Sequence, residues 1–141
     1  MTEEITQGEA LVQIEVPRIV IPRINDDAIR KHRIGKFVGI LIGEEPHMMF
    51  GREGSYHSNL LKAMLEQFGL RYDLQESEDG DKMIPKPLGD GYKAVSMGRF
   101  MMGRNSVILH GDSDDYGLTP NPEFLEQMKL YLPEDLIFEL R

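Results

Sequence analysis

His57 is the residue of this sequence best placed for acid–base chemistry. It follows Ser55 and Tyr56 and precedes the segment from Leu60 to Phe68, whose apolar residues recur at helical spacing. This position is the first turn of a predicted helix, where the helix dipole and free amide groups favour a bound anion. They also favour a neutral imidazole, which can accept a proton from water near neutral pH. The alternative is a histidine that serves only as a polar first-turn residue.

A glycine-framed loop follows the apolar run at 107–109. It reads Gly-Asp-Ser-Asp-Asp-Tyr-Gly, from Gly111 to Gly117. Open sheets bind ligands beyond the carboxyl ends of their strands. Consecutive backbone amides between two glycines can converge there on an oxyanion. The alternative is a tight polar turn whose aspartates hydrogen-bond to their own backbone.

Two other sets of side chains could contribute chemistry. Lys36 opens an apolar strand, where it either adds a cation to such a site or is an ordinary solvated strand end. One imidazole and three carboxylates suit magnesium or manganese, and they come from His110, Asp112, Asp114 and Asp115. Their spacing matches no known metal cage, so a solvated turn is the preferred interpretation. We expect no metal and no cofactor.

The elements that must position these residues form an α/β pattern. Hydrophobic periodicity predicts strands over 37–42, 47–52, 70–74, 92–97, 105–110 and 136–140, and helices over 57–68 and 122–132. Residues 75–91 are rich in charge, glycine and proline, which favours a loop. The resulting order β-β-α-β-β-β-α-β predicts a mixed sheet with two helices, and it fits neither a doubly wound fold nor a barrel.

Residues 1–33 differ from the rest of the chain. Apolar and polar residues alternate over 11–16, and two prolines within 17–24 suit an edge strand or an extended arm. A basic cluster, 30–33, follows. We interpret residues 1–33 as an N-terminal arm that lies either on the domain formed by 34–141 or on a partner subunit. In the second case the protein would be a homodimer.

Size and composition limit the class of protein. The 141 residues correspond to one domain, and 40% of them are hydrophobic, as in a globular protein. There is no cysteine, which excludes a disulfide framework, a thiolate metal site and a cysteine nucleophile. The net charge of −8 disfavours nucleic acid and anionic membranes as partners. Apolar runs are too short to span a bilayer and the acidic start lacks a signal-peptide pattern, so we expect a cytoplasmic protein.

From Lys36 to the C-terminus, about three quarters of the chain, the sequence resembles the protein histidine phosphatase family, also called the Janus/Ocnus family. Three stretches carry the resemblance. They are the apolar strand opened by Lys36, the Tyr56-His57 pair at the start of the first helix, and the Gly-x-Ser-x-x-Tyr-Gly loop that contains Ser113 and Tyr116.

The resemblance implies a six-stranded mixed sheet flanked by two helices. It also implies metal-independent removal of phosphate from phosphohistidine, a related phosphoamidate or a phosphomonoester, borne by a protein or a small ligand. His57 would be the general base acting on water or on the phosphoryl group, and Lys36 would neutralise charge on the phosphoryl oxygens. The phosphate would be bound by the hydroxyl and amide of Ser113, the amide of Asp115, and Tyr56.

The chain departs from the family pattern in two places. The family has a Gly-Gly-Gly-Arg segment where this chain has Gly89 to Tyr92, so one cation is missing, and Arg99 or Arg104 is the candidate replacement. The loop also carries three aspartates where the family has neutral residues, and carboxylates facing a phosphate would repel it. The alternative function is therefore a non-catalytic phosphate- or nucleotide-binding module that keeps the fold and the pocket.

Overall fold

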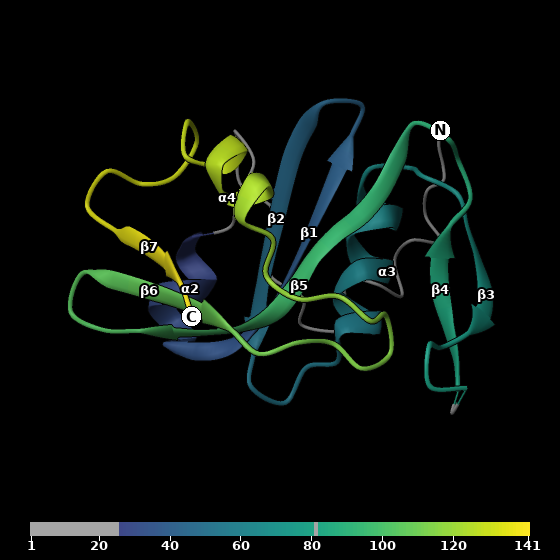
Figure 1. The fold of residues 1–141 in the computed structure, drawn as a ribbon, viewed down its shortest axis with the longest axis horizontal. Coiled ribbons are helices and arrows are strands. Elements are labelled where there is room, and N and C mark those ends of the chain that lie inside the picture. The colour runs from purple at the N-terminus through teal and green to yellow at the C-terminus, as the bar shows by residue number, and fades with distance from the viewer. Residues whose placement is uncertain (1–25, 81) are drawn as a thin grey trace.

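The computed structural model describes residues 26–80 and 82–141, which form three helices and seven strands (Figure 1). In chain order they are α2 (Asp26–His32), β1 (Ile34–Ile42), β2 (Glu45–Arg52), α3 (His57–Gln67), β3 (Tyr72–Glu76), β4 (Met83–Pro87), β5 (Tyr92–Met102), β6 (Ser106–His110), α4 (Pro122–Met128) and β7 (Ile137–Leu140). The strands expected within residues 1–25 lie outside the described residues.

The main sheet is mixed and has the strand order β2-β1-β5-β6-β7. Its pairs are antiparallel except for β6 and β7, which run parallel. The predicted α+β class and mixed sheet are confirmed, but the prediction of six strands is wrong. The missing strand is β3, which pairs with β4 in a separate two-stranded sheet. Four of the five residues of β3 are exposed, so this strand offers too little apolar surface for a place in the central sheet.

Residues 75–91, predicted to be a loop, contain the strand β4. Pro85 and Pro87 belong to this strand and have no N–H, so they cannot donate the ladder hydrogen bonds that a strand with neighbours on both sides requires. A strand that pairs on one side only tolerates them. The two-stranded sheet stands beside α3, at the right of Figure 1.

The main sheet is covered on both faces, because side chains of β1 alternate between two hydrophobic clusters. Val38 faces a cluster that α3 completes with Leu60 and Leu61. Phe37 faces the other cluster, to which α4 contributes Phe124. The nearly continuous apolar run of β1 therefore predicted a central strand correctly. The cap at Asn121 is also confirmed, since its side chain accepts a hydrogen bond of 2.9 Å from the backbone N–H of Phe124.

Helix α2 was not predicted from the sequence. Ala28 and Ile29 are buried in the cluster that contains Phe37, and Arg30 forms an ion pair of 2.9 Å with Asp135. The described end of the expected N-terminal arm therefore packs on the domain.

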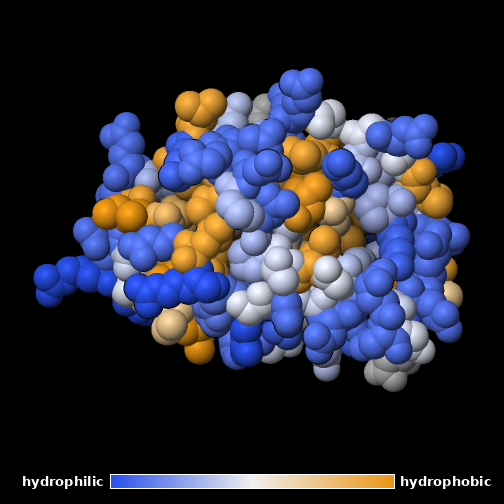
Figure 2. All heavy atoms as spheres, viewed as in Figure 1, coloured by the Kyte–Doolittle hydropathy of each residue, from blue (hydrophilic) through white to orange (hydrophobic). Residues whose placement is uncertain are grey.

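The surface in Figure 2 is largely hydrophilic, with hydrophobic atoms in separate patches. Within the described ranges, no helix is both long enough and apolar enough to cross a membrane.

Gly35 lies where β1 and β2 pair, and a Cβ atom there would overlap the carbonyl oxygen of Gly51 and approach the ring of Phe100 to 2.8 Å. A backbone carbonyl cannot move aside cheaply. We therefore expect Gly35→Ala to lower the free energy of unfolding by about 1–3 kcal/mol, measured by urea denaturation. Gly91→Ala is the matched control, because a Cβ atom at Gly91 meets nothing within 4 Å. Equal stability of the two variants would contradict the expectation.

Candidate functional site

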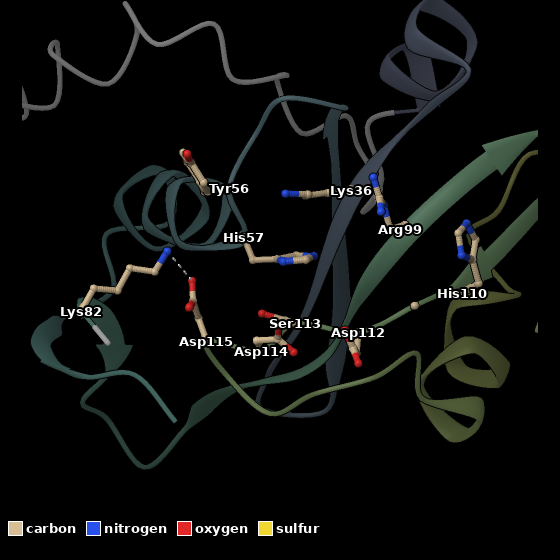
Figure 3. Close-up of a pocket in the computed structure, with 11 residues that line it drawn as sticks. Lys36, Tyr56, His57, Lys82, Arg99, His110, Asp112, Ser113, Asp114 and Asp115 are labelled. Atoms are coloured by element: carbon tan, nitrogen blue, oxygen red, sulfur yellow. Dashed lines mark ion pairs between the residues drawn. The ribbon is translucent and has the colours of Figure 1, made fainter. Parts of the chain in front are cut away.

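A pocket of about 480 Å³ opens where β1, the start of α3, β5 and the loop after β6 meet (Figure 3). The residues to which the sequence assigns a role all line it: Lys36, Tyr56, His57, Ser113 and Asp115. Three stretches that are distant in the sequence thus contribute to one cavity. Arg99 lines it as well and Arg104 does not, so Arg99 is the one of these two arginines that lies at the site.

His57 is the first residue of α3 and is 7% exposed. Its Nε2 lies 2.8 Å from the carbonyl oxygen of Gly98 on β5. A carbonyl only accepts hydrogen bonds, so the neutral ring holds its proton on Nε2. Among the described residues nothing hydrogen-bonds to Nδ1. The Gly98 carbonyl therefore fixes the ring and leaves Nδ1 as the proton acceptor available to a ligand.

Burial lowers the pKa of His57 below its ordinary value of 6.5. The positive charge of Lys36 lowers this pKa further, while the hydrogen bond to Gly98 opposes both. His57 is consequently neutral near pH 7, which is the form that can accept a proton.

An NMR titration of the His57 ring is expected to give a midpoint below 6.5, with the resonance assigned by its loss in His57→Asn.

The lowered pKa of His57 also makes the free energy of unfolding depend on pH. Because the unfolded chain takes up a proton at higher pH than the folded protein, the stabilisation is fully present above 6.5 and is lost as the pH falls towards the folded pKa. Urea midpoints from about pH 8 to about pH 5 should decrease less in His57→Asn than in the natural sequence. An NMR titration midpoint of His57 at or above pH 6.5 would contradict both expectations.

The loop after β6 presents one buried hydroxyl to the pocket. Gly111 and Gly117 frame the loop with φ values of 76° and 65°, which favour glycine. The Ser113 amide donates to Leu118 at 2.8 Å, so it holds the turn, and only the hydroxyl of Ser113 is left for a ligand. That side chain is 3% exposed, and its Oγ has no hydrogen-bond partner in the described part of the chain. A buried polar atom without a partner is costly, which points to a ligand or a water molecule as its partner.

Lys36, Arg99 and Lys82 bring three cations to the pocket. Arg99 is ion-paired with Glu53, and Lys82 lies 3.2 Å from Asp115. The ammonium group of Lys36 forms no ion pair with any residue of 26–80 or 82–141. Burial and, next, the charge of Arg99 lower the pKa of Lys36, and the carboxylates of Glu53 and Asp115 partly oppose this shift. A bound anion would stabilise the charged form of Lys36 further.

Tyr56 forms one wall at the mouth of the pocket and is 57% exposed. Its ring lies 5.5 Å from Nζ of Lys36 and 5.1 Å from Nζ of Lys82. Cation–π contacts of this kind hold ammonium groups beside an aromatic ring. The ring of Tyr56 therefore contacts both lysines, and in Figure 3 its hydroxyl points away from His57.

The aspartates of the loop alternate in direction. In Figure 3 the carboxylate of Asp115 is turned towards Lys82, whereas the side chains of Asp112 and Asp114 point away from His57 and Lys36. All three aspartates line the pocket, and the charges of Asp115 and Asp112 raise the pKa of His57, so the ion pair with Lys82 reduces the predicted repulsion of a phosphate but does not remove it. Within the described residues no group of three or more histidine, aspartate and glutamate side chains could hold a metal ion, so nothing supports the metal site considered for His110 and these aspartates.

Three site residues were not found from the sequence: Lys82, Glu53 and Gly98. Lys82 comes from the turn between β3 and β4, and Glu53 from the turn after β2. Each looks in the sequence like an ordinary charged turn residue. Gly98 contributes a carbonyl and carries no side-chain signal, although its tight surroundings leave no room for a Cβ atom.

No protein-family model matches this chain, and no curated protein sequence is significantly similar to it.

Proposed function

We propose that this protein hydrolyses a phosphoamidate such as phosphohistidine, or a related phosphomonoester, without a metal ion. The observation that carries the proposal is the unpaired ammonium group of Lys36, which shares a pocket with the proton-accepting His57 and the unpartnered hydroxyl of Ser113. A placed cation and a hydrogen-bond donor can stabilise the phosphoryl oxygens, and a base can activate the attacking water. The phosphate-bearing partner would be a protein or a small molecule in the cytoplasm.

In the proposed reaction the phosphoryl oxygens lie against Lys36 and accept a hydrogen bond from Ser113. Nδ1 of His57 accepts a proton from water as the water oxygen forms a bond to phosphorus. The P–N bond breaks, and the departing nitrogen takes the electron pair of that bond. It then takes a proton from the imidazolium of His57, which restores the base; where solvent protonates the nitrogen instead, the imidazolium returns its proton to solvent. Lys36 stabilises the charge that develops on the phosphoryl oxygens.

The test is phosphate release from phosphohistidine and phospholysine by the purified protein, with and without a chelator. The proposal expects turnover above the uncatalysed rate, with the same rate in chelator. Absence of turnover across a panel of phosphoamidates and phosphomonoesters would reject hydrolysis.

A non-catalytic anion-binding module is the second candidate, and one observation favours it. Two of the three cations are already ion-paired, Arg99 with Glu53 and Lys82 with Asp115, so less positive charge is free to stabilise a transition state. Calorimetry with inorganic phosphate and nucleotides separates the two functions. Binding without turnover supports the module, and turnover rejects it.

A further inference from the structure

The charges that line the pocket do not by themselves balance those of a phosphoryl group. Lys82 is paired with Asp115, and Arg99 is paired with Glu53. The lysine, arginine and aspartate side chains that line the pocket and form no ion pair within the described part of the chain are one cation and two anions: Lys36, Asp112 and Asp114. A phosphoryl group brings roughly two further negative charges near pH 7. One ammonium group cannot neutralise all of these, so positive charge carried by the ligand itself would favour binding.

The two unpaired aspartates lie on the side of the pocket formed by the loop after β6. In Figure 3, Lys36 lies above the ring of His57, and the loop that carries Asp112 and Asp114 lies below it. Burial lowers the pKa of His57 most, and of the nearby charges Lys36 lowers it while Asp112 raises it, so charges of both signs act at this ring. Between the two aspartates, the buried Oγ of Ser113 has no hydrogen-bond partner among the described residues, which independently points to a ligand at this loop.

Further carboxylates continue from this loop onto the turn between β3 and β4. The backbone N–H of Glu78 in that turn donates a hydrogen bond of 2.8 Å to the carbonyl oxygen of Asp115, so the turn and the loop are neighbours. We call the exposed carboxylates of the loop and the turn the acidic rim: Asp112, Asp114, Glu78 and Asp79. Two lysines oppose them, because Lys82 is paired with Asp115 and Lys86 approaches Glu78 to 3.9 Å. The carboxylates outnumber these lysines, so this side of the pocket attracts positive charge.

We propose that the substrate is a phosphorylated residue within a basic segment of a protein, whose lysine or arginine side chains contact the acidic rim. The phosphoryl group lies against Lys36, as in the proposed function, and the neighbouring basic side chains supply the positive charge that the pocket lacks. A segment is favoured over a single ammonium group because the acidic rim extends past the residues that line the pocket, to Glu78 and Asp79. This inference rests on the proposed function and names the class of its substrate.

Calorimetry tests this inference without turnover, and a chelator prevents a metal ion from supplying the positive charge. Three unlabelled peptides each carry a non-hydrolysable phosphonate residue at the centre, flanked by lysines, by glycines or by glutamates. The lysine peptide should bind about tenfold more tightly than the glycine peptide at low ionic strength, and the glutamate peptide should bind most weakly. Added salt should reduce these differences. Equal affinity of the three peptides would overturn the inference.

The double variant Asp112→Asn, Asp114→Asn should reduce the ratio of lysine-peptide to glycine-peptide affinity by about fivefold, because two exposed ion pairs are lost. It should also strengthen binding of the glycine peptide, since two carboxylates no longer repel the phosphonate. Asp90→Asn is the matched control, because Asp90 is exposed in the turn before β5 and does not line the pocket. An equal effect of Asp90→Asn would mean that the net charge of −8 alone attracts lysine, which rejects the acidic rim. Thermal melts confirm folding, and either single variant serves if the double variant is not folded.

Turnover then separates this inference from the proposed function. Phosphohistidine peptides with the same three flanks should be hydrolysed with kcat/KM values in the order lysine, glycine, glutamate. If the lysine phosphonate peptide binds preferentially but no phosphohistidine peptide is hydrolysed, the basic segment stands as the ligand and hydrolysis fails. If the three peptides are hydrolysed and bound alike, hydrolysis stands and the basic segment is rejected. Binding of 2-aminoethylphosphonate as tight as that of the lysine peptide would also reject the segment, in favour of a small zwitterion.

Discussion

His57→Ala is expected to reduce phosphate release from phosphohistidine by about 10²–10⁴-fold, the usual contribution of a positioned general base. Nδ1 of His57 is a proton acceptor to which no described residue hydrogen-bonds, and the substitution removes it. The cations and the Ser113 hydroxyl remain, so substrate binding should decrease much less than turnover. Single-turnover kinetics measure the chemical step, and calorimetry with inorganic phosphate measures binding.

Two comparisons make this expectation specific to the base. Free imidazole added to His57→Ala should restore part of the lost rate, because the cavity left by the ring can hold the small molecule. His32→Ala is the control, since His32 ends α2 and does not line the pocket. A His57→Ala protein that is folded and keeps its turnover would show that proton abstraction occurs elsewhere.

Several residues that line the pocket could be picked out from the sequence because they lie next to strong local patterns, while their roles stay predictions. Phe37 and Val38 are both buried, on opposite faces of the sheet, so their apolar run marks a central strand and places Lys36 at its start. Leu60 and Leu61 mark the helix that begins at His57. These patterns involve residues close together in the chain, so the helix and the strand can be predicted from hydrophobic periodicity alone.

The parts that were missed depend on contacts between distant segments. The choice between Arg99 and Arg104 stayed open in the sequence, because Arg99 reaches the pocket through a register of β5 on β1 that sets it opposite Lys36, and no local pattern fixes that register. Lys82 approaches Asp115 only because β3 and β4 form their own small sheet. Helix α2 escaped prediction because its apolar contribution is Ala28 and Ile29, too few residues to establish a helical period.

Lys36→Met is expected to lower kcat/KM for phosphohistidine by about 10²–10³-fold, as removal of one preorganised charge does in other active sites. Methionine keeps the apolar stem of the side chain and removes the charge. Burial lowers the pKa of Lys36, so folding works against its charged form and the variant should be at least as stable as the natural sequence. Lys62→Met is the control, because Lys62 is an exposed residue of α3 outside the pocket.

The same variant also tests the geometry of the pocket without any substrate. The charge of Lys36 lowers the pKa of His57, so its removal should raise the NMR titration midpoint of the ring, while Lys62→Met should leave that midpoint unchanged. A raised midpoint together with lost turnover means that Lys36 and His57 act on one bound phosphoryl group. A raised midpoint with full turnover would show that the two side chains are neighbours but that the phosphoryl charge is stabilised by another cation, and the unpaired ammonium group would lose its place in the proposed function.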